Sequence, residues 1–153
     1  MHMADALLSP AVGGTMWAAT AGLIAYSAKK VHDEADEQKA PLMGVLGAFI
    51  FAAQMINFPV AGGTSGHLLG GVLVASILGP SAAALVLASV LILQCLLFAD
   101  GGITALGANV VNMALVGVFS GWLIFRAFAA AIPGRAGKLA GVAVGAWVSV
   151  VLG

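Results

Sequence analysis

Residues 81–99 read SAAALVLASVLILQCLLFA, an uninterrupted apolar run that lies between a Gly-Pro pair and the polar turn at 100–102. About 20 mostly apolar residues are enough to cross the hydrocarbon core of a bilayer as a helix. We therefore predict a transmembrane helix over 81–99 and interpret the rest of the chain outward from it.

The whole chain shares this apolar character. Of its 153 residues, 61% are hydrophobic and only 8% are charged, and the mean hydropathy is +1.09. A soluble domain carries roughly 25% charged residues, so this composition predicts an integral membrane protein. The net charge is zero, which gives no support to nucleic-acid binding. The single cysteine, Cys95, excludes an internal disulfide.

Glycine and proline breaks divide the chain into six predicted helices, which we assign to one all-α transmembrane domain over 1–153. Their ranges are about 13–28, 42–58, 67–78, 81–99, 103–131 and 137–153. The third would rise only about 18 Å, short of the roughly 30 Å hydrocarbon core, so we expect it to begin inside the membrane at the bottom of a cavity. The last helix stops at Gly153 without a polar end, and we expect a short homologue or a fragment of a longer protein.

All six basic residues fall on one side when six helices alternate across the membrane. They are Lys29, Lys30, Lys39, Arg126, Arg135 and Lys138. By the positive-inside rule, that side is cytoplasmic. The amino terminus, Asp5, His2, His67 and Asp100 then share the outer side.

Two of the three histidines on this chain predict a metal site. The amine of Met1, the backbone nitrogen of His2 and its Nδ1 can close a five-membered and a six-membered chelate ring on one ion, provided that Met1 is retained with a free amine. These three nitrogens lie in one plane, and an imidazole nitrogen of His67 would complete four. Such a plane suits Ni(II) or Cu(II), and low-spin Co(II) is also compatible, whereas zinc prefers a tetrahedron. His32 lies among the charges of the cytoplasmic loop and is interpreted as a solvated histidine.

The surroundings of the two histidines supply candidate supporting groups. A metal-bound histidine usually donates its other ring N–H to an acceptor. Candidates by position are Asp5, Gln54, Asn57, Thr64 and Ser65, with Asn109 and Asn112 in a supporting role near the site and Gln94 in an interhelical hydrogen bond. The glycines Gly62, Gly63 and Gly66 would let the loop lie beneath the amino terminus, although the same composition is also typical of an ordinary flexible loop.

Two further patterns concern helix contacts. Gly117 and Gly121 form one GxxxG pair, and Gly137, Gly141 and Gly145 form a double one. This spacing is typical of close helix packing in membranes. We interpret it as packing inside the protein, with docking against a partner membrane subunit as the alternative.

Three stretches carry a family resemblance. MHMADALLSP at residues 1–10 resembles the MHIPDGFLSP-type start of the CbiM/NikM family, the substrate-specific (S) components of energy-coupling factor (ECF) transporters for cobalt and nickel. FPVAGGTSGHLLGG at 58–71 and GGITALGANVVNMALVG at 101–117 are similar to internal stretches of that family. Met3 and Ala6 depart from the familiar start, where the family has Ile and Gly.

The resemblance implies a planar nitrogen site for Ni(II) or Co(II), with Met1, His2 and His67 as ligands. It also implies an S-component-like helical bundle in a prokaryotic plasma membrane, with several spans and the amino terminus outside. The implied partners are a transmembrane T component, two cytoplasmic ATPases and often a small accessory membrane subunit.

The sequence itself contains no GxxxxGK[ST] phosphate loop. We therefore expect a transporter subunit that is not an enzyme and binds no nucleotide. The alternatives are a metal-selective channel or facilitator, which works without ATPases, and a membrane metal sensor.

Overall fold

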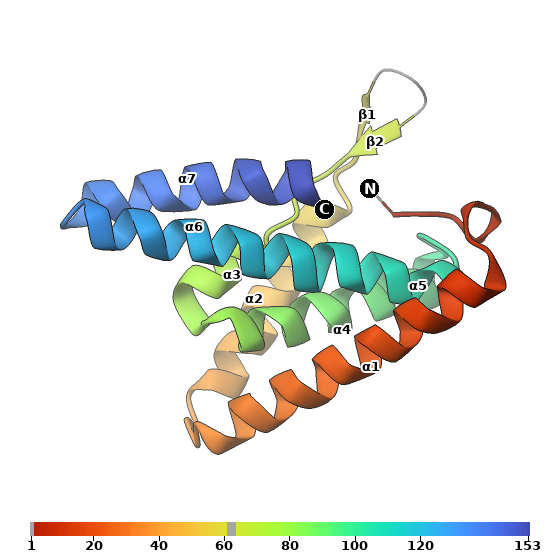
Figure 1. The fold of residues 1–153 in the computed structure, drawn as a ribbon, viewed down its shortest axis with the longest axis horizontal. Coiled ribbons are helices and arrows are strands. Elements are labelled where there is room, and N and C mark those ends of the chain that lie inside the picture. The colour runs from red at the N-terminus through yellow and green to blue at the C-terminus, as the bar shows by residue number, and fades with distance from the viewer. Residues whose placement is uncertain (1, 61–63) are drawn as a thin grey trace.

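The computed structural model describes residues 2–60 and 64–153. In chain order its elements are η1 (Asp5–Leu7), α1 (Pro10–Asp33), α2 (Lys39–Gln54), β1 (Phe58–Val60), β2 (Thr64–Gly66), α3 (Gly71–Leu78), α4 (Pro80–Phe98), α5 (Ile103–Val110), η2 (Val111–Gly117), α6 (Val118–Ala131) and α7 (Arg135–Leu152). Figure 1 shows a helical bundle from which one short hairpin projects, beside the amino terminus.

The apolar run at 81–99 forms α4, the central helix of the bundle, as predicted. It begins with Pro80 in the first turn, where a missing N–H costs nothing. Leu87 and Leu91 are fully buried, and α1, α2, α3 and α5 all pack against the helix. The helix ends at Ala99, which has a left-handed backbone with φ 52°.

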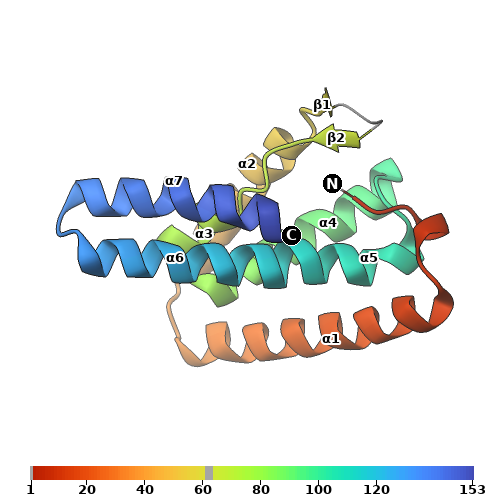
Figure 2. The ribbon, with the colours of Figure 1, turned by 45° about the horizontal axis from the view of Figure 1, so that its top comes forward.

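The predicted helix at 103–131 is one long rod made of α5, η2 and α6 (Figure 2). Its middle segment, η2, is π-helical. The rod packs along α7 through glycines, since a Cβ on Gly145 would lie 2.5 Å from the carbonyl oxygen of Gly121. The interpretation of the GxxxG pairs as packing inside the protein is confirmed for this contact.

The first helix, α1, is longer than predicted and is tied to α5. It starts at Pro10 rather than at 13, because Ser9 caps it by accepting a hydrogen bond from the N–H of Val12 at 3.4 Å. The buried hydroxyl of Thr20 donates to the carbonyl oxygen of Gly107 at 2.8 Å. This bond fixes α1 against the helix that follows the outer turn.

The predictions for the second and third helices ran too far into the segment between them. α2 ends at Gln54 rather than at 58, because 58–60 pair with 64–66 as antiparallel strands. α3 begins at Gly71 rather than at 67, because Gly70 has φ +75° and a Cβ there would collide with Ile50. The glycine therefore ends an extended stretch, and His67 lies outside any helix.

The six predicted helices are all present in the described part of the chain. They differ in whether their length and hydropathy are sufficient to span a membrane. Three described helices have both the length and the hydropathy, namely Pro80–Phe98, Ile103–Ala131 and Arg135–Leu152. α2 is apolar but shorter, and α3 has only 8 residues. The short third helix that the sequence predicted is thus even shorter.

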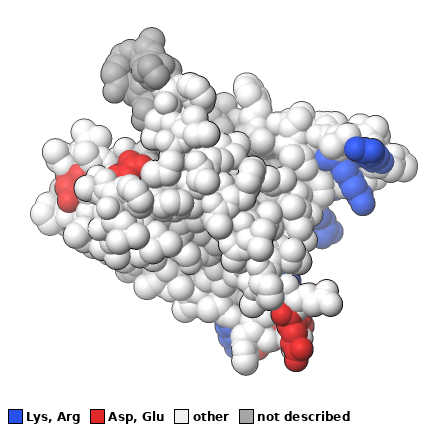
Figure 3. Space-filling model, turned by 180° about the vertical axis from the view of Figure 1, so that it is seen from behind, with Lys and Arg blue, Asp and Glu red and all other residues white. Residues whose placement is uncertain are grey.

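The two ends of the bundle differ in charge. The basic side chains, drawn blue in Figure 3, gather toward the α1–α2 and α6–α7 connections. The amino-terminal segment, the hairpin and the α4–α5 turn lie at the other end (Figure 1). This separation matches the charge asymmetry from which the orientation was predicted.

Candidate metal centre

His2 and His67 meet at the end of the bundle that carries the amino terminus. Their rings stack with centroids 5.2 Å apart and planes 29° apart. The side chain of His2 is only 5% exposed, and His67 is 9% exposed. The structure thus brings together the two imidazoles that the sequence assigned to one site.

His67 is held in a form suited to binding a metal ion. Its Nδ1 lies 3.0 Å from the carbonyl oxygen of Leu68, to which only a protonated nitrogen can donate. Its Nε2 is buried without a hydrogen-bond partner among the described residues. A buried nitrogen with a free lone pair is a suitable metal ligand, because burying a polar atom without any partner costs free energy.

The segment that carries His67 is anchored from α2. The fully buried side chain of Gln54 donates from Nε2 to the carbonyl oxygen of Leu69 at 2.9 Å. A cavity of about 400 Å³ lies beside the segment, between α3 and α7, and is lined by His67, Leu69 and Ser149 among others. Gln54, a candidate partner by position, therefore holds the backbone after His67 rather than its ring.

His2 contacts the carboxylate of Asp100, with Nδ1 and Oδ1 3.3 Å apart. Its Nε2 is buried without a partner among the described residues. Nδ1, which the chelate assigns to the ion, therefore faces a carboxylate in this arrangement. Burial lowers the pKa of His2, and the nearby negative charge of Asp100 partly opposes that effect. The lowered pKa favours the neutral imidazole, which is the form that binds metals.

Asn109 clamps the amino-terminal segment just behind His2. Its Oδ1 accepts from the N–H of Met3 at 2.8 Å, and its Nδ2 donates to the carbonyl oxygen of Met3 at 3.3 Å. The N–H of Gly102 donates to the same carbonyl at 3.4 Å. The predicted supporting role of Asn109 thus has a geometric basis, through the backbone next to His2.

Asp5 is engaged elsewhere. Its Oδ1 accepts from the N–H of Ala105 at 2.8 Å, which caps the first turn of α5 from outside that helix. A Cβ on Gly102 would collide with this carboxylate, so the glycine makes room for it. Asp5 therefore fastens the amino-terminal segment to α5 and contacts neither histidine.

The other predicted residues are less informative. Asn57 is exposed and precedes β1. Asn112 is half-buried in η2. Met1, Gly62 and Gly63 lie outside the described residues, and the side chains of Thr64 and Ser65 are not described.

Asp100 is the contact residue that the sequence reasoning missed. It served there only as a marker of the outer side. The sequence did offer a signal for it, because Asp100 directly follows the predicted helix at 81–99 and lies on the same side as His2. Among the described residues, no three His, Cys, Asp or Glu side chains form a metal-ligand group.

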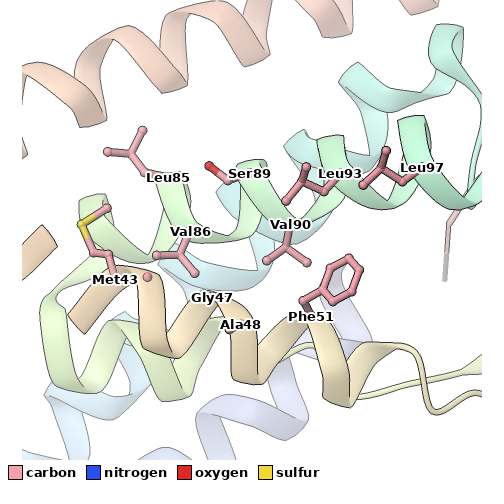
Figure 4. A pocket seen from close by; sticks show the side chains of 11 residues that line it. Met43, Gly47, Ala48, Phe51, Leu85, Val86, Ser89, Val90, Leu93 and Leu97 are labelled. Carbon is pink, nitrogen blue, oxygen red and sulfur yellow. The ribbon is translucent and has the colours of Figure 1, made fainter. Parts of the chain in front are cut away.

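A second hollow lies away from the histidines, between α2 and α4 (Figure 4). It has a volume of about 490 Å³, and its side chains are apolar except for Ser89. Such a lining offers a cation almost no donor atoms.

Comparison with known proteins identifies the family of this chain. The chain matches the CbiM family, described as "Cobalt uptake substrate-specific transmembrane region", over residues 2–153. A NikMN relative from Archaeoglobus fulgidus is 42% identical over 152 residues, which cover 99% of this chain and 49% of the relative. The cobalt transport protein CbiM of Acetoanaerobium sticklandii is 39% identical over 135 residues, covering 83% of this chain and 54% of the relative.

The fold also matches a solved structure. A crystal structure of a truncated transition metal transporter superposes with a TM-score of 0.90 at 39% identity, covering 98% of this chain and 69% of that one. The chain spans about half the length of the two curated relatives above. With a family match over almost its whole length and a common fold, the chain belongs to the CbiM family.

Proposed function

We propose that this chain is the substrate-specific component of a nickel or cobalt uptake system. It captures Ni(II) or Co(II) at the outer face in a planar site of four nitrogens. The ligands are the amine of Met1, the backbone nitrogen and imidazole of His2, and the imidazole of His67. Ions of these metals accept such a planar set, whereas zinc does not.

The observation that carries the proposal is the meeting of two buried imidazoles from segments far apart in the chain. Their centroids are 5.2 Å apart, and each Nε2 lacks a hydrogen-bond partner among the described residues. A buried polar atom without a partner destabilises a protein by about 1–3 kcal/mol. A metal ion bound to Nε2 of His67 would remove this penalty at that atom, while Nδ1 of His2 closes the proposed chelate.

Transport inward requires energy from other subunits. No phosphate-binding loop is present in this sequence, and the family resemblance implies a T component, two cytoplasmic ATPases and often a small accessory membrane subunit. In this scheme the chain sits in a prokaryotic plasma membrane with its amino terminus outside. ATP-driven movement of the T component opens the site toward the cytoplasm.

The test is to replace His2 by alanine and to measure Ni(II) and Co(II) binding to the purified chain. His2→Ala removes the imidazole that closes the six-membered chelate ring, so we expect binding to collapse, and His67→Ala to behave similarly. His32→Ala is the matched control, because His32 is exposed at the end of α1. Unchanged binding in His2→Ala would refute the chelate.

Uptake in cells separates transport from the alternatives. We expect accumulation of Ni(II) or Co(II) only when the T component and both ATPases are also present. Flux without ATPases would instead indicate a channel or facilitator. Tight binding with no flux, even with the partners present, would indicate a sensor.

A further inference from the structure

Asp100 occupies a rigid position beside the amino-terminal imidazole. It lies in the turn between α4 and α5, where Ala99 has φ 52° and Gly101 has φ +82°. Its own N–H donates to the carbonyl oxygen of Gln94 at 3.2 Å. The turn thus places Asp100 beside the amino-terminal segment, where a Cβ on the neighbouring Gly101 would lie 3.4 Å from Cβ of His2.

The side chain of Asp100 lies between the protein surface and the buried imidazole of His2. It is 29% exposed, whereas the imidazole that it contacts is 5% exposed. Asp5, the other carboxylate of the outer end, is already committed to the N–H of Ala105. Asp100 is therefore the carboxylate available to a buried histidine.

We propose that Asp100 is a positioning residue for the metal-binding imidazole of His2, accepting a hydrogen bond from whichever ring nitrogen does not bind the ion. The inference rests on the proposed function and assigns Asp100 a part in it. Carboxylate partners of this kind fix the orientation of a ligating histidine and increase its basicity.

The geometry supports this role for either ring nitrogen. As the ring lies, Nδ1 faces Oδ1 at 3.3 Å and Nε2 is the free nitrogen. Turning the ring over about Cβ–Cγ puts Nε2 where Cε1 was, next to the former place of Nδ1. Nε2–H then reaches the side of Asp100, and Nδ1 becomes free to close the chelate with the backbone.

The ring rotation also links this carboxylate to the chelate. The fused rings require Nδ1 of His2, and that nitrogen faces Oδ1 of Asp100 at 3.3 Å. In the proposed bound state, this contact is replaced by a hydrogen bond from Nε2–H, so that the carboxylate stays paired. Its negative charge also lies close to the incoming dication, which favours binding.

The experiment compares Asp100→Ala, Asp100→Asn and Asp100→Glu in the full chain, purified in detergent. The measurements are Ni(II) affinity by calorimetry and the d–d absorption spectrum at saturating Ni(II). Glu37→Gln is the matched control, because it removes one exposed carboxylate at the opposite end of the bundle.

We expect Asp100→Ala to weaken Ni(II) binding by about 10–100-fold, with a smaller loss for Asp100→Asn, which keeps an acceptor oxygen. At saturation, the d–d band of Asp100→Ala should move to longer wavelength, because a loosely held imidazole is a weaker ligand. Asp100→Glu should restore part of the affinity, and Glu37→Gln should match the wild type. A purely structural role would not shift the band of the loaded site.

The outcomes separate this inference from the proposed function. If the wild-type chain binds neither Ni(II) nor Co(II), the proposed function itself fails. If the wild type binds and both Asp100→Ala and Asp100→Asn show its affinity and spectrum, the role of Asp100 is overturned. If Asp100→Ala does not fold, the same comparison is made with Asp100→Asn, whose side chain has the same shape.

Discussion

At the scale of single residues, the site depends on side chains that hold backbone rather than metal. Asn109 pairs with both polar groups of Met3, and Gln54 holds the carbonyl of Leu69. One fixes the chain next to His2, and the other fixes the chain after His67. Two flexible segments are thereby placed before an ion arrives, which lowers the entropic cost of binding.

Asn109→Ala tests this placement. It removes two hydrogen bonds worth about 1 kcal/mol each, so Ni(II) affinity should fall by roughly 30-fold. Amide hydrogen exchange in residues 2–7 should become faster at the same time. Gln38→Ala changes an exposed amide in the α1–α2 loop and should alter neither quantity. Wild-type affinity in Asn109→Ala would show that docking of Met3 does not limit binding.

At the scale of elements, the α4–α5 turn is the platform of the site. It carries Asp100, its Gly102 binds the carbonyl of Met3, and it leads into the helix that Asp5 caps. The turn thereby joins the end of the central helix to the amino-terminal segment. Small residues are needed in this turn because the amino-terminal segment lies directly on the backbone of the turn.

Gly102→Ala tests the close approach. Gly102 has an ordinary backbone, with φ −98°, so an alanine is not strained by conformation. Its Cβ would collide with the Asp5 carboxylate, and such overpacking costs about 1–3 kcal/mol. We expect Ni(II) binding to weaken roughly tenfold, measured by calorimetry. Gly22→Ala, where a Cβ meets nothing within 4 Å, should bind as the wild type does.

The contact between α6 and α7 is a second test at this scale. A Cβ on Gly145 would lie 2.5 Å from the carbonyl oxygen of Gly121, and a backbone atom cannot move aside like a side chain. Gly145→Ala should therefore destabilise the bundle by about 1–3 kcal/mol. Thermal unfolding in detergent should show a melting temperature several degrees lower. Gly14→Ala, in open space on α1, should melt no lower than the wild type.

At the scale of the whole molecule, the charge distribution supports the proposed orientation. The basic residues lie at one end (Figure 3), and the histidine pair lies at the other. By the positive-inside rule, the proposed metal site would then face the outside. The proposed uptake role needs this orientation, because such a component must meet its ion before any ATPase acts.

Labelling of single cysteines tests the orientation. In a Cys95→Ala background, we would place one cysteine at Leu7, which is 73% exposed, and another at the exposed Glu37. A membrane-impermeant maleimide added to intact cells should label Leu7→Cys, whereas Glu37→Cys should react only after permeabilisation. The reverse pattern would invert the topology and contradict capture from outside.

Much of the architecture could be predicted because it depends on local composition. The run at 81–99 is apolar throughout, so its own composition predicts a membrane helix, and it forms α4. The Gly-Pro pair before it and the Pro-Gly pair at 133–134 are strong helix stops. The helix ends were predicted less well, since the end of α2 depends on a hairpin that pairs 58–60 with 64–66.

The sequence by itself determined the membrane class, the six helices, the polarity of the two ends and the two histidines of the candidate site. Only the tertiary structure decided which groups surround those histidines. Asp5 was one of five candidate partners for a histidine and caps α5, while Asp100, which the sequence used only to mark the outer side, contacts His2. The physical reason is that hydropathy acts locally along the chain, whereas a hydrogen-bond partner is chosen by proximity between segments about a hundred residues apart.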